Sequence, residues 1–563
     1  MASDPATDSL KRRLMRLPSM ALAIALVPLL AAVASLPALA APLKIKAPAV
    51  PVIDWKPCFE EFEDLQCATV KVPLDYRKPF GAKTDLAVAR ILASDSKNKI
   101  GTLFLNPGGP GASGVDLIFN GFGDYLNEAL QGKFDIMGWD PRGTGESTPI
   151  QCWNNDDIRD AYFQDLPTFP YLANQEANFF ARYRNIAYRC ASRKQPIFKH
   201  MSTADVARDL DLLRQAVGDQ RLNYLGYSYG SFIGNTYANL YPKKVRAMVI
   251  DGVLDPNLWS SGWQIKADRS STDEVLQEFF KQCDLAGQDC DLSGPSGSKA
   301  RFDAILAVGR RQTIVIGEGE DIFEYAYDEL VGDAIGAMYT PEVWPSYADF
   351  LDLLSVAMQG DKAASKKALI RHRAIQQKFR DAGPVPRSVY DNSLEAYYGN
   401  HCADAGYPSG FKWYSAISKY ADAGSFVGPS WWWNNAACAA WPTARNRYAG
   451  PWKTTTSTPV LVIGNYFDPA TNYAGAVASN RQLRNSRLLS YAGWGHTAAF
   501  SGRSVCTDDY VVGYLLNGDL PAPGTVCPAA ANPFVFAKTR AKAGKAVPMP
   551  MVGLPTLRPQ RPR

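Results

Sequence analysis

The chain has 563 residues, of which 46% are hydrophobic and 20% are charged. This composition is typical of globular proteins and excludes collagen, a long coiled coil and wholesale disorder. The formal net charge of +5 comes from the two ends of the chain, since residues from Lys538 onward include seven basic and no acidic side chains. The body between the ends is mildly acidic, which argues against a nucleic-acid-binding core.

The N-terminus has the pattern of an export signal. Basic residues at 11–16 precede an apolar run from Met20 to Ala34, and Ala38-Leu39-Ala40 supplies a small-x-small cleavage site. The run contains Pro28 and is shorter than the roughly 20 apolar residues that span a bilayer, so cleavage is favoured over an uncleaved anchor. We therefore expect a signal peptide over 1–40, a secreted or periplasmic protein, and no membrane association after cleavage.

The ten cysteines and four histidines include no C-x-x-C pair. This pattern favours disulfides in an oxidising compartment over zinc or redox chemistry, and no metal or cofactor is expected. Spacing alone does not fix the connectivity of ten cysteines. We adopt nearest-neighbour pairing as a hypothesis, with bonds 58–67, 152–190, 283–290, 402–438 and 506–527.

Strand and helix patterns alternate in chain order after a Pro-rich linker at 42–52. Strands are expected at 85–93, 101–105, 134–139, 222–225 and 245–250, and helices at 202–217 and from the turn after 225 to Tyr241. Strands that alternate with helices predict crossover connections and a mostly parallel sheet.

The character of the chain changes between about 256 and 450, where helical periodicity, Trp and Tyr replace strand signals. Strand patterns return at 459–463 and 486–490. We therefore predict one α/β domain, made of residues 41–255 and 451–530, that is split by a mainly helical cap over 256–450. The Pro- and Ala-rich basic tail at 531–563 is expected to be disordered.

The segment Gly226-Tyr227-Ser228-Tyr229-Gly230 follows a predicted strand and opens a predicted helix. This G-x-S-x-G pattern is typical of a strained strand-to-helix turn that projects a nucleophilic serine from the sheet edge. Glycines two positions either side of the serine relieve the collisions in so sharp a turn. The context favours a catalytic role for Ser228 over a chance match.

A serine nucleophile needs an adjacent base, and the chain order in this arrangement is serine, acid, histidine. His200 therefore comes too early. His372 lies in a charged helical segment and is predicted to be a solvated surface residue, and His401 beside Cys402 is interpreted as structural. His496 follows the last strand-like segment and is the predicted base.

The third member is a carboxylate that orients the imidazole and stabilises the imidazolium. Asp468 follows the strand at 459–463 and lies 28 residues before His496. Asp251, at the end of the strand 245–250, is the rival candidate. The position in the sheet favours Asp468.

The glycine-rich loop Asn106–Gly111 follows an early strand and predicts one half of an oxyanion hole. The predicted donors are the amide of Gly109 and that of Tyr229, which follows the nucleophile. No Lys-Ser/Thr follows the loop, which argues against a phosphate-binding loop. Asp140 and Arg142 are expected to form a buried ion pair behind it.

Together these motifs resemble the α/β-hydrolase serine aminopeptidases, a group that includes secreted tripeptidyl aminopeptidases and, more distantly, prolyl aminopeptidases. The resemblance spans about residues 53 to 528. It rests on WKPC (55–58), CATVKVPLDY (67–76), NPGGPGASG (106–114), WDPRGTGES (139–147), GYSYG (226–230), DGV (251–253), CAD (402–404), DPAT (468–471) and GH (495–496). Prolyl relatives usually begin the oxyanion loop with His, whereas Asn106 stands there in this chain, as in the tripeptidyl relatives.

The resemblance implies a capped α/β-hydrolase that removes short peptides from free N-termini. Ser228, Asp468 and His496 match the family's nucleophile, orienting acid and base, and peptides with a free N-terminus are the expected partners. Some relatives with this pattern are carboxylesterases, so hydrolysis of small acyl esters is an alternative. A non-catalytic binding module is a third hypothesis, against which the intact set of motifs argues.

An aminopeptidase has to bind a protonated amine, which calls for a carboxylate in a restricted pocket. Asp404 and Glu395 in the cap are the candidates, with a structural role as the alternative for each. The tryptophans at 431–433 and Trp441 either line that pocket or belong to the core of the cap.

Overall fold

The computed structural model describes residues 47–535 except 61–63, 320–321 and 382–389. The signal peptide expected at 1–40 lies outside the described residues, as do residues 536–563 of the expected tail. Within the described range, every helix is too short or too polar to cross a membrane.

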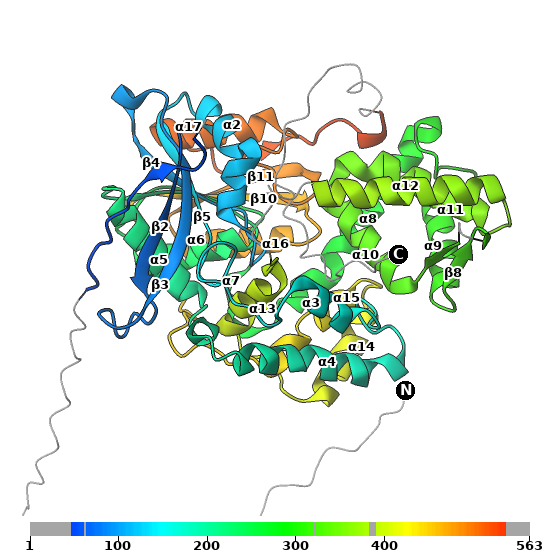
Figure 1. The fold of residues 1–563 in the computed structure, drawn as a ribbon. Coiled ribbons are helices and arrows are strands. Elements are labelled where there is room, and N and C mark those ends of the chain that lie inside the picture. Colours follow the sequence, from blue (N-terminus) through cyan, green and yellow to red (C-terminus); the bar gives the residue numbers. More distant parts are fainter. Residues whose placement is uncertain (1–46, 61–63, 320–321, 382–389, 536–563) are drawn as a thin grey trace, which may run out of the picture. The chain divides into compact units, whose positions relative to one another are not determined.

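One ten-stranded sheet runs through the molecule in the order β1-β2-β3-β5-β4-β6-β7-β10-β11-β12 (Figure 1). The first three strands pair antiparallel, and β3 also pairs antiparallel with β5. All further pairs are parallel, which confirms the predicted mostly parallel sheet. The strands are β1 (Lys56–Pro57), β2 (Leu65–Pro73), β3 (Lys83–Ile91), β4 (Gly101–Asn106), β5 (Phe134–Trp139), β6 (Leu222–Tyr227), β7 (Val245–Asp251), β10 (Val460–Phe467), β11 (Ser486–Trp494) and β12 (Val526–Cys527).

Both faces of the sheet are apolar, because successive side chains of a strand point to opposite sides. In β4, Leu103 and Leu105 belong to one hydrophobic cluster and Phe104 belongs to the other. The first cluster includes residues of α1 (Gly114–Leu117), α2 (Gly123–Ala129) and α17 (Val505–Asn517). The second includes α5 (Thr203–Ala216), α6 (Tyr229–Leu240) and α16 (Tyr473–Leu483). Helices therefore cover both faces, as predicted for the α/β fold.

A mainly helical region, here called the cap, lies between β7 and β10 in the chain, as predicted. It has one small hairpin, β8 (Ile314–Ile316) with β9 (Phe323–Tyr325). Its helices are α7 (Pro256–Ser261), α8 (Ile265–Ala286), α9 (Ser298–Gly309), α10 (Tyr327–Tyr339), α11 (Trp344–Ala357), α12 (Lys362–Asp381), α13 (Ser393–Asp404), α14 (Phe411–Asp422) and α15 (Gly428–Trp433).

Two aromatic clusters form the core of the cap. One is built around Trp344 and joins α8–α12. The other contains Trp432 and Trp433, both almost fully buried, and also includes α4 (Ala173–Ser192), which precedes the cap in sequence, as does α3 (Asp156–Phe163). The packing therefore crosses the boundary expected at 255–256.

Five disulfides join neighbouring cysteines along the chain, and all ten cysteines are bonded. The nearest-neighbour hypothesis is confirmed for every pair: Cys58–Cys67, Cys152–Cys190, Cys283–Cys290, Cys402–Cys438 and Cys506–Cys527. This density of disulfides is typical of proteins from an oxidising compartment.

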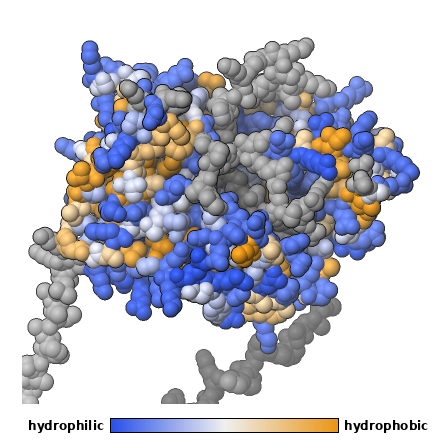
Figure 2. All heavy atoms as spheres, viewed as in Figure 1, coloured by the Kyte–Doolittle hydropathy of each residue, from blue (hydrophilic) through white to orange (hydrophobic). Residues whose placement is uncertain are grey.

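Hydrophilic residues cover much of the face seen in Figure 2, and apolar residues form separate patches on it. The exposed large apolar side chains, among them Val52, Phe80 and Val505, come from different segments of the chain. Such scattering is ordinary on the surface of a globular protein.

Candidate active site

Ser228 lies in the sharp turn between β6 and α6, with φ of 56° and ψ of −122°. This conformation is strained for a residue with a side chain, and its amide donates a hydrogen bond to the carbonyl of Asp251 (2.8 Å). A Cβ on Gly226 would stand 2.6 Å from the carbonyl oxygen of Gly230. The strand–turn–helix geometry expected of the G-x-S-x-G motif is therefore present, together with its need for glycine.

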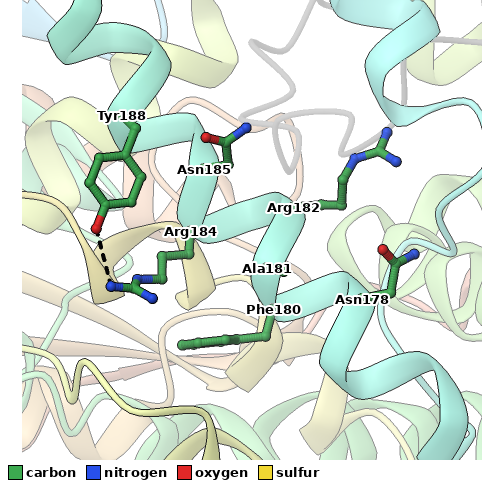
Figure 3. A pocket seen from close by; sticks show the side chains of 7 residues that line it. All are labelled: Asn178, Phe180, Ala181, Arg182, Arg184, Asn185 and Tyr188. Carbon is green, nitrogen blue, oxygen red and sulfur yellow. Dashed lines mark hydrogen bonds between the residues drawn. The ribbon is translucent and has the colours of Figure 1, made fainter.

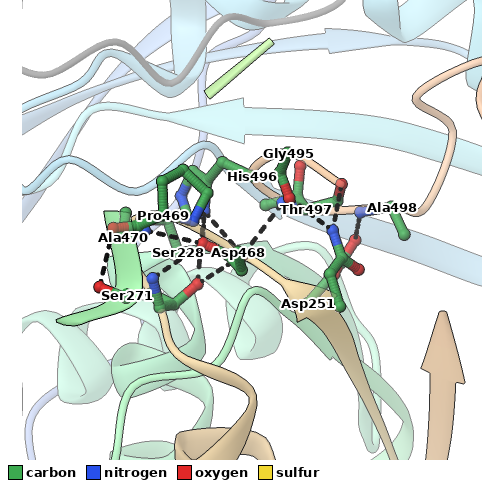
Figure 4. A network of polar contacts seen from close by, with 12 residues as sticks. Ser228, Asp251, Ser271, Asp468, Pro469, Ala470, Gly495, His496, Thr497 and Ala498 are labelled. Atoms are coloured by element: carbon green, nitrogen blue, oxygen red, sulfur yellow. Dashed lines mark hydrogen bonds and ion pairs between the residues drawn. The ribbon is translucent and has the colours of Figure 1, made fainter. Parts of the chain in front are cut away.

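His496 follows β11, and its ring contacts the carboxylate of Asp468, which follows β10 (Figure 4). The distances from His496 Nδ1 to Asp468 Oδ1 and Oδ2 are 2.9 and 3.0 Å. The two loops meet because β10 and β11 are adjacent parallel strands whose carboxyl ends lie at the same edge. The structure thus brings together the predicted base and the predicted acid across 28 residues of sequence.

Asp468 is surrounded by donors. Its carboxylate accepts hydrogen bonds from the amides of Ala470 (2.9 Å) and Thr471 (2.8 Å) and from Thr471 Oγ1 (2.8 Å). Burial by itself raises the pKa of Asp468, but the attraction and hydrogen bond of His496 and these amides outweigh it and hold the pKa below its ordinary value. The carboxylate is therefore ionised at neutral pH, as an imidazolium partner requires.

Asp251, the rival acid, does not contact the imidazole through its side chain. Its Oδ2 accepts hydrogen bonds from the amides of Ala498 (2.8 Å) and Ala499 (2.7 Å) in the loop that carries His496. Burial raises the pKa of Asp251 to about 6. The sequence did not predict that Asp251 holds the histidine loop through these hydrogen bonds, because the motif gives no indication of a partner 247 residues away.

The second ring nitrogen of His496, Nε2, is buried and has no hydrogen-bond partner among the described residues. A Cβ on Gly252 would lie 3.2 Å from Cε1 of this ring, and the neighbouring Asp251 carbonyl bonds the amide of Ser228. Figure 4 accordingly shows Ser228 beside His496 and Asp468. The free nitrogen thus lies in the same small region as the serine turn.

The glycine-rich loop after β4 packs directly on the serine turn. A Cβ on Gly108 would stand 2.8 Å from Cβ of Ser228 and 3.0 Å from the amide nitrogen of Tyr229. The Gly108 amide is already bonded to Asn106 Oδ1 (3.0 Å). The amides of Gly109 and Tyr229, by contrast, donate no hydrogen bond to any described residue. Both predicted oxyanion donors are therefore available for a substrate oxygen.

The pairing expected between Asp140 and Arg142 is wrong. Arg142 instead pairs with Asp209, with Nε and Nη2 at 2.7 and 2.6 Å from its carboxylate oxygens. Asp140 accepts hydrogen bonds from Ser113 Oγ (2.5 Å) and from the amide of Glu146 (2.9 Å). Both side chains are fully buried. The charge of Arg142 is balanced by Asp209, and the Asp140 carboxyl is hydrogen-bonded by Ser113 and the Glu146 amide.

The two carboxylates expected to bind an amine, Asp404 and Glu395, are enclosed in the cap. Asp404 is 2% exposed and accepts hydrogen bonds from the amide (2.8 Å) and hydroxyl (2.5 Å) of Thr203. Glu395 is 0% exposed and accepts a hydrogen bond from the hydroxyl of Tyr390. Burial raises the pKa of each to about 7. These contacts favour a structural role for both.

A second residue prediction is wrong at His372. Its Nε2 lies 2.8 Å from Asp333 Oδ2, and its ring packs against Phe323 and Phe350. The side chain is half-buried between α12 and its neighbours rather than solvated. The charged sequence around it gave no sign of a partner on α10.

A surface recess on α4 is separate from these residues (Figure 3). All of its lining residues come from that helix, and Arg184 donates a hydrogen bond to the hydroxyl of Tyr188 (3.1 Å). The lining residues are Asn178, Phe180, Ala181, Arg182, Arg184, Asn185 and Tyr188.

The described residues contain no group of three His, Cys, Asp or Glu side chains placed to hold a metal ion.

Comparison with known proteins places this geometry in a family. Residues 101–273 match the family model of the alpha/beta hydrolase fold, and residues 424–527 match that of TAP-like proteins. Carboxylesterase B of Mycobacterium tuberculosis is 31% identical over 492 residues, covering 85% of this chain and 90% of the relative. The chain therefore belongs to the α/β-hydrolase family.

Two further relatives are proteases by name. Serine protease Hip1 of Mycobacterium tuberculosis is 29% identical over 495 residues, or 84% of this chain and 91% of that protein. Tripeptidyl aminopeptidase of Streptomyces lividans is 29% identical over 496 residues, or 85% of this chain and 87% of that protein. The relatives together support a serine hydrolase and include both peptidases and an esterase.

Proposed function

We propose that this chain is an exported serine exopeptidase that releases short peptides, tripeptides or similar, from free N-termini. The observation that carries the proposal is the buried contact between Asp468 and His496 Nδ1, beside a strained serine turn. The similarity to a tripeptidyl aminopeptidase and a serine protease supports peptide substrates. The five disulfides support export, for which the N-terminal 40 residues supply the signal.

In the proposed mechanism Ser228 Oγ attacks the carbonyl carbon of the scissile bond. His496 Nε2, the ring nitrogen without a partner, takes the serine proton and then donates it to the leaving amine. The amides of Gly109 and Tyr229 stabilise the oxyanion that forms. Water then attacks the acyl-enzyme on Ser228, with His496 again as base, and releases the peptide.

Asp468 holds the imidazole in the tautomer that carries its proton on Nδ1. The Nδ1 position is bonded to a carboxylate that stays ionised, so Nε2 is left as the basic nitrogen. Apart from the substrate and the attacking water, every group that acts in this mechanism belongs to the chain.

A carboxylesterase is the second candidate, because a relative with that name is 31% identical over 85% of this chain. The same acyl-enzyme steps hydrolyse an ester, with an alcohol in place of the amine as leaving group. The catalytic residues do not distinguish the two reactions, so the distinction lies in the residues that bind the substrate.

A substrate panel tests the proposal. Aminoacyl, dipeptidyl and tripeptidyl 4-nitroanilides are compared with 4-nitrophenyl acetate and butyrate under identical conditions. We expect the highest kcat/KM on a tripeptidyl anilide with a free N-terminus, and much lower values on its N-acetylated form. Turnover of the esters alone would contradict the exopeptidase and favour the carboxylesterase.

A further inference from the structure

Asp268 lies in the first turn of α8, on the helix face that contacts the loop of Asp468. Ser271 Oγ and Thr272 Oγ1 both donate hydrogen bonds to the carbonyl of Pro469, at 2.9 and 3.0 Å. Ser271 and Pro469 are seen in Figure 4. Residues 268, 271 and 272 are spaced i, i+3 and i+4 and therefore share a face. Because side chains on a helix tilt toward its N-terminus, the Asp268 carboxylate lies on that face on the N-terminal side of the Ser271 contact.

The charge of Asp268 acts on two tyrosines that lie close to the active-site loops. Burial, then the charges of Asp468 and Asp268, raise the pKa of Tyr339, whose ring centre is 5.1 Å from that of His496. Burial and then the charge of Asp268 also raise the pKa of Tyr397. The Tyr397 amide nitrogen stands 2.8 Å from where a Cβ on Gly111 of the oxyanion loop would lie.

Asp268 also has acceptor capacity that the described chain leaves unused. Its Oδ1 accepts a hydrogen bond from Gln264 Nε2 (2.8 Å), and Oδ2 accepts none from any described residue. Gln264 is 7% exposed, and its Oε1 likewise has no partner among the described residues. Asp268 is half-buried as a residue, whereas Asp404 and Glu395 are almost fully buried.

No cation is among the described groups that shift the pKa of Asp268. Burial raises the pKa of Asp268 to about 8, with the hydrogen bond of Gln264 opposing the shift and the charge of Asp468 adding to it. Among the described residues, the groups that shift this pKa include no Lys or Arg. A cation bound beside this carboxyl would stabilise its ionised form, so a half-buried Asp268 on the helix that contacts the Asp468 loop is suited to a cationic ligand.

Resting on the exopeptidase function proposed above, we propose that Asp268 binds the α-ammonium group of the peptide substrate, with Gln264 as the positioning residue that holds its carboxylate. An ammonium group offers three donors and no acceptor, which matches the unused oxygens of this pair. A fixed anchor for the N-terminus also sets how many residues, at roughly 3.3–3.6 Å each, reach from it to Ser228. The same contact therefore selects free N-termini and limits the length of the released peptide.

The test compares Asp268→Asn with wild type on three substrates: a tripeptidyl 4-nitroanilide, its N-acetylated form and 4-nitrophenyl acetate. Asparagine keeps the size of the side chain and an acceptor for Gln264 but removes the charge. Because a charge-assisted hydrogen bond is lost, the ratio of kcat/KM for the free-amine peptide to that for the ester should fall about 10- to 100-fold. The loss should appear mainly in KM, since the contact forms with the ground state as well as the transition state.

Asp273→Asn is the matched control on the same helix. Asp273 is also half-buried and its pKa is also raised by burial, to about 6, but its hydrogen-bond partner is Ser425 rather than Gln264. This variant should keep the wild-type ratio. Asp268→Glu, which retains a carboxylate, should keep more of the preference for the free amine than Asp268→Asn does.

Thermal unfolding of each variant separates binding from folding. An unchanged ratio in a folded Asp268→Asn protein, or equal losses in Asp268→Asn and Asp268→Glu, would overturn the inference and leave the proposed function intact. A wild type that hydrolyses neither peptide nor ester would instead contradict the proposed function itself.

Discussion

A carboxylate in a loop at the sheet edge and a carboxylate on a cap helix have pKa values that are shifted in opposite directions. Asp468, at the sheet edge, has a pKa below its ordinary value, whereas Asp268, on the cap helix that contacts its loop, has a pKa of about 8. Burial acts in the same direction on both. The difference lies in the donors, because Asp468 receives two amides, a hydroxyl and an imidazole, and Asp268 receives one side-chain amide.

The two kinds of backbone explain this contrast. Loops after parallel strands leave amide groups unpaired, and these amides point at whatever side chain follows the strand. Within a helix the amides are consumed by i to i−4 bonds, so a carboxylate on a helix face depends on side chains for its donors. The donors around Asp468 thus hold its negative charge in place, whereas Asp268 on the cap helix lacks such a set of donors.

The largest effect is expected at the serine. Ser228→Ala removes the nucleophile and should lower kcat by at least about 10⁴-fold, since loss of the nucleophile in a triad leaves only binding and oxyanion stabilisation. The melting temperature should stay at or above that of wild type, because the strained turn loses a side-chain atom and no partner. Wild-type turnover in this variant would remove Ser228 from the mechanism.

Two aspartates at neighbouring strand ends sharpen the assignment of the acid. Asp468→Asn should lower kcat on the order of 10⁴-fold, because asparagine no longer fixes the tautomer of His496. Asp251→Asn keeps an acceptor for the amides of Ala498 and Ala499 and should cost far less, about 10-fold or under. Steady-state kinetics on one substrate gives kcat for both variants. Equal losses of kcat would contradict the assignment of Asp468 as the only orienting acid.

Two disulfides of the cap close loops of different length and should therefore contribute differently to stability. Removing Cys402–Cys438, which spans 36 residues and begins on α13 against the oxyanion loop, should lower the free energy of unfolding by about 4 kcal/mol. Removing Cys283–Cys290, which spans 7 residues, should lower it by about 2 kcal/mol. Denaturant unfolding of the two double-alanine variants measures both. A larger effect at the short loop would contradict the entropic account.

The smallest effect is a pH dependence of stability that originates in the cap. The folded-state pKa of Asp404 is about 7 against an ordinary value of 3.8, so between these values the unfolded chain loses a proton that the folded protein keeps. Stability therefore falls as pH rises through this window. Asp468, whose pKa is lowered, contributes stability that is lost only when the pH falls below its ordinary range.

We expect the melting temperature to be a few degrees lower at pH 8 than at pH 5, and the difference to shrink in Asp404→Asn, which does not titrate. Glu395, with a pKa of about 7, adds to the same trend and remains in the variant. Calorimetry at the two pH values measures the difference. An identical pH dependence in wild type and variant would show that Asp404 is ionised in the folded protein throughout.

The sequence by itself determined the features that depend on neighbours along the chain. The turn at Ser228 follows from glycines two residues away, and the alternation of strands and helices predicts the parallel sheet. Once that sheet is accepted, Asp468 and His496 fall at the carboxyl ends of adjacent strands, so their meeting also follows from the pattern. The five disulfides join cysteines 7 to 38 residues apart, where short loops favour local closure.

Only the tertiary structure decided which distant groups satisfy one another. Arg142, in the loop after β5, pairs with Asp209 of α5 rather than with Asp140, and His372 of α12 contacts Asp333 of α10, because packing brings separate segments together. Packing also decided how far each cap carboxylate is buried: Asp404 is almost fully buried, whereas Asp268 is half-buried. Periodicity shows which face of a helix is apolar, but a partner across the interior depends on how the helices pack, and no local pattern encodes it.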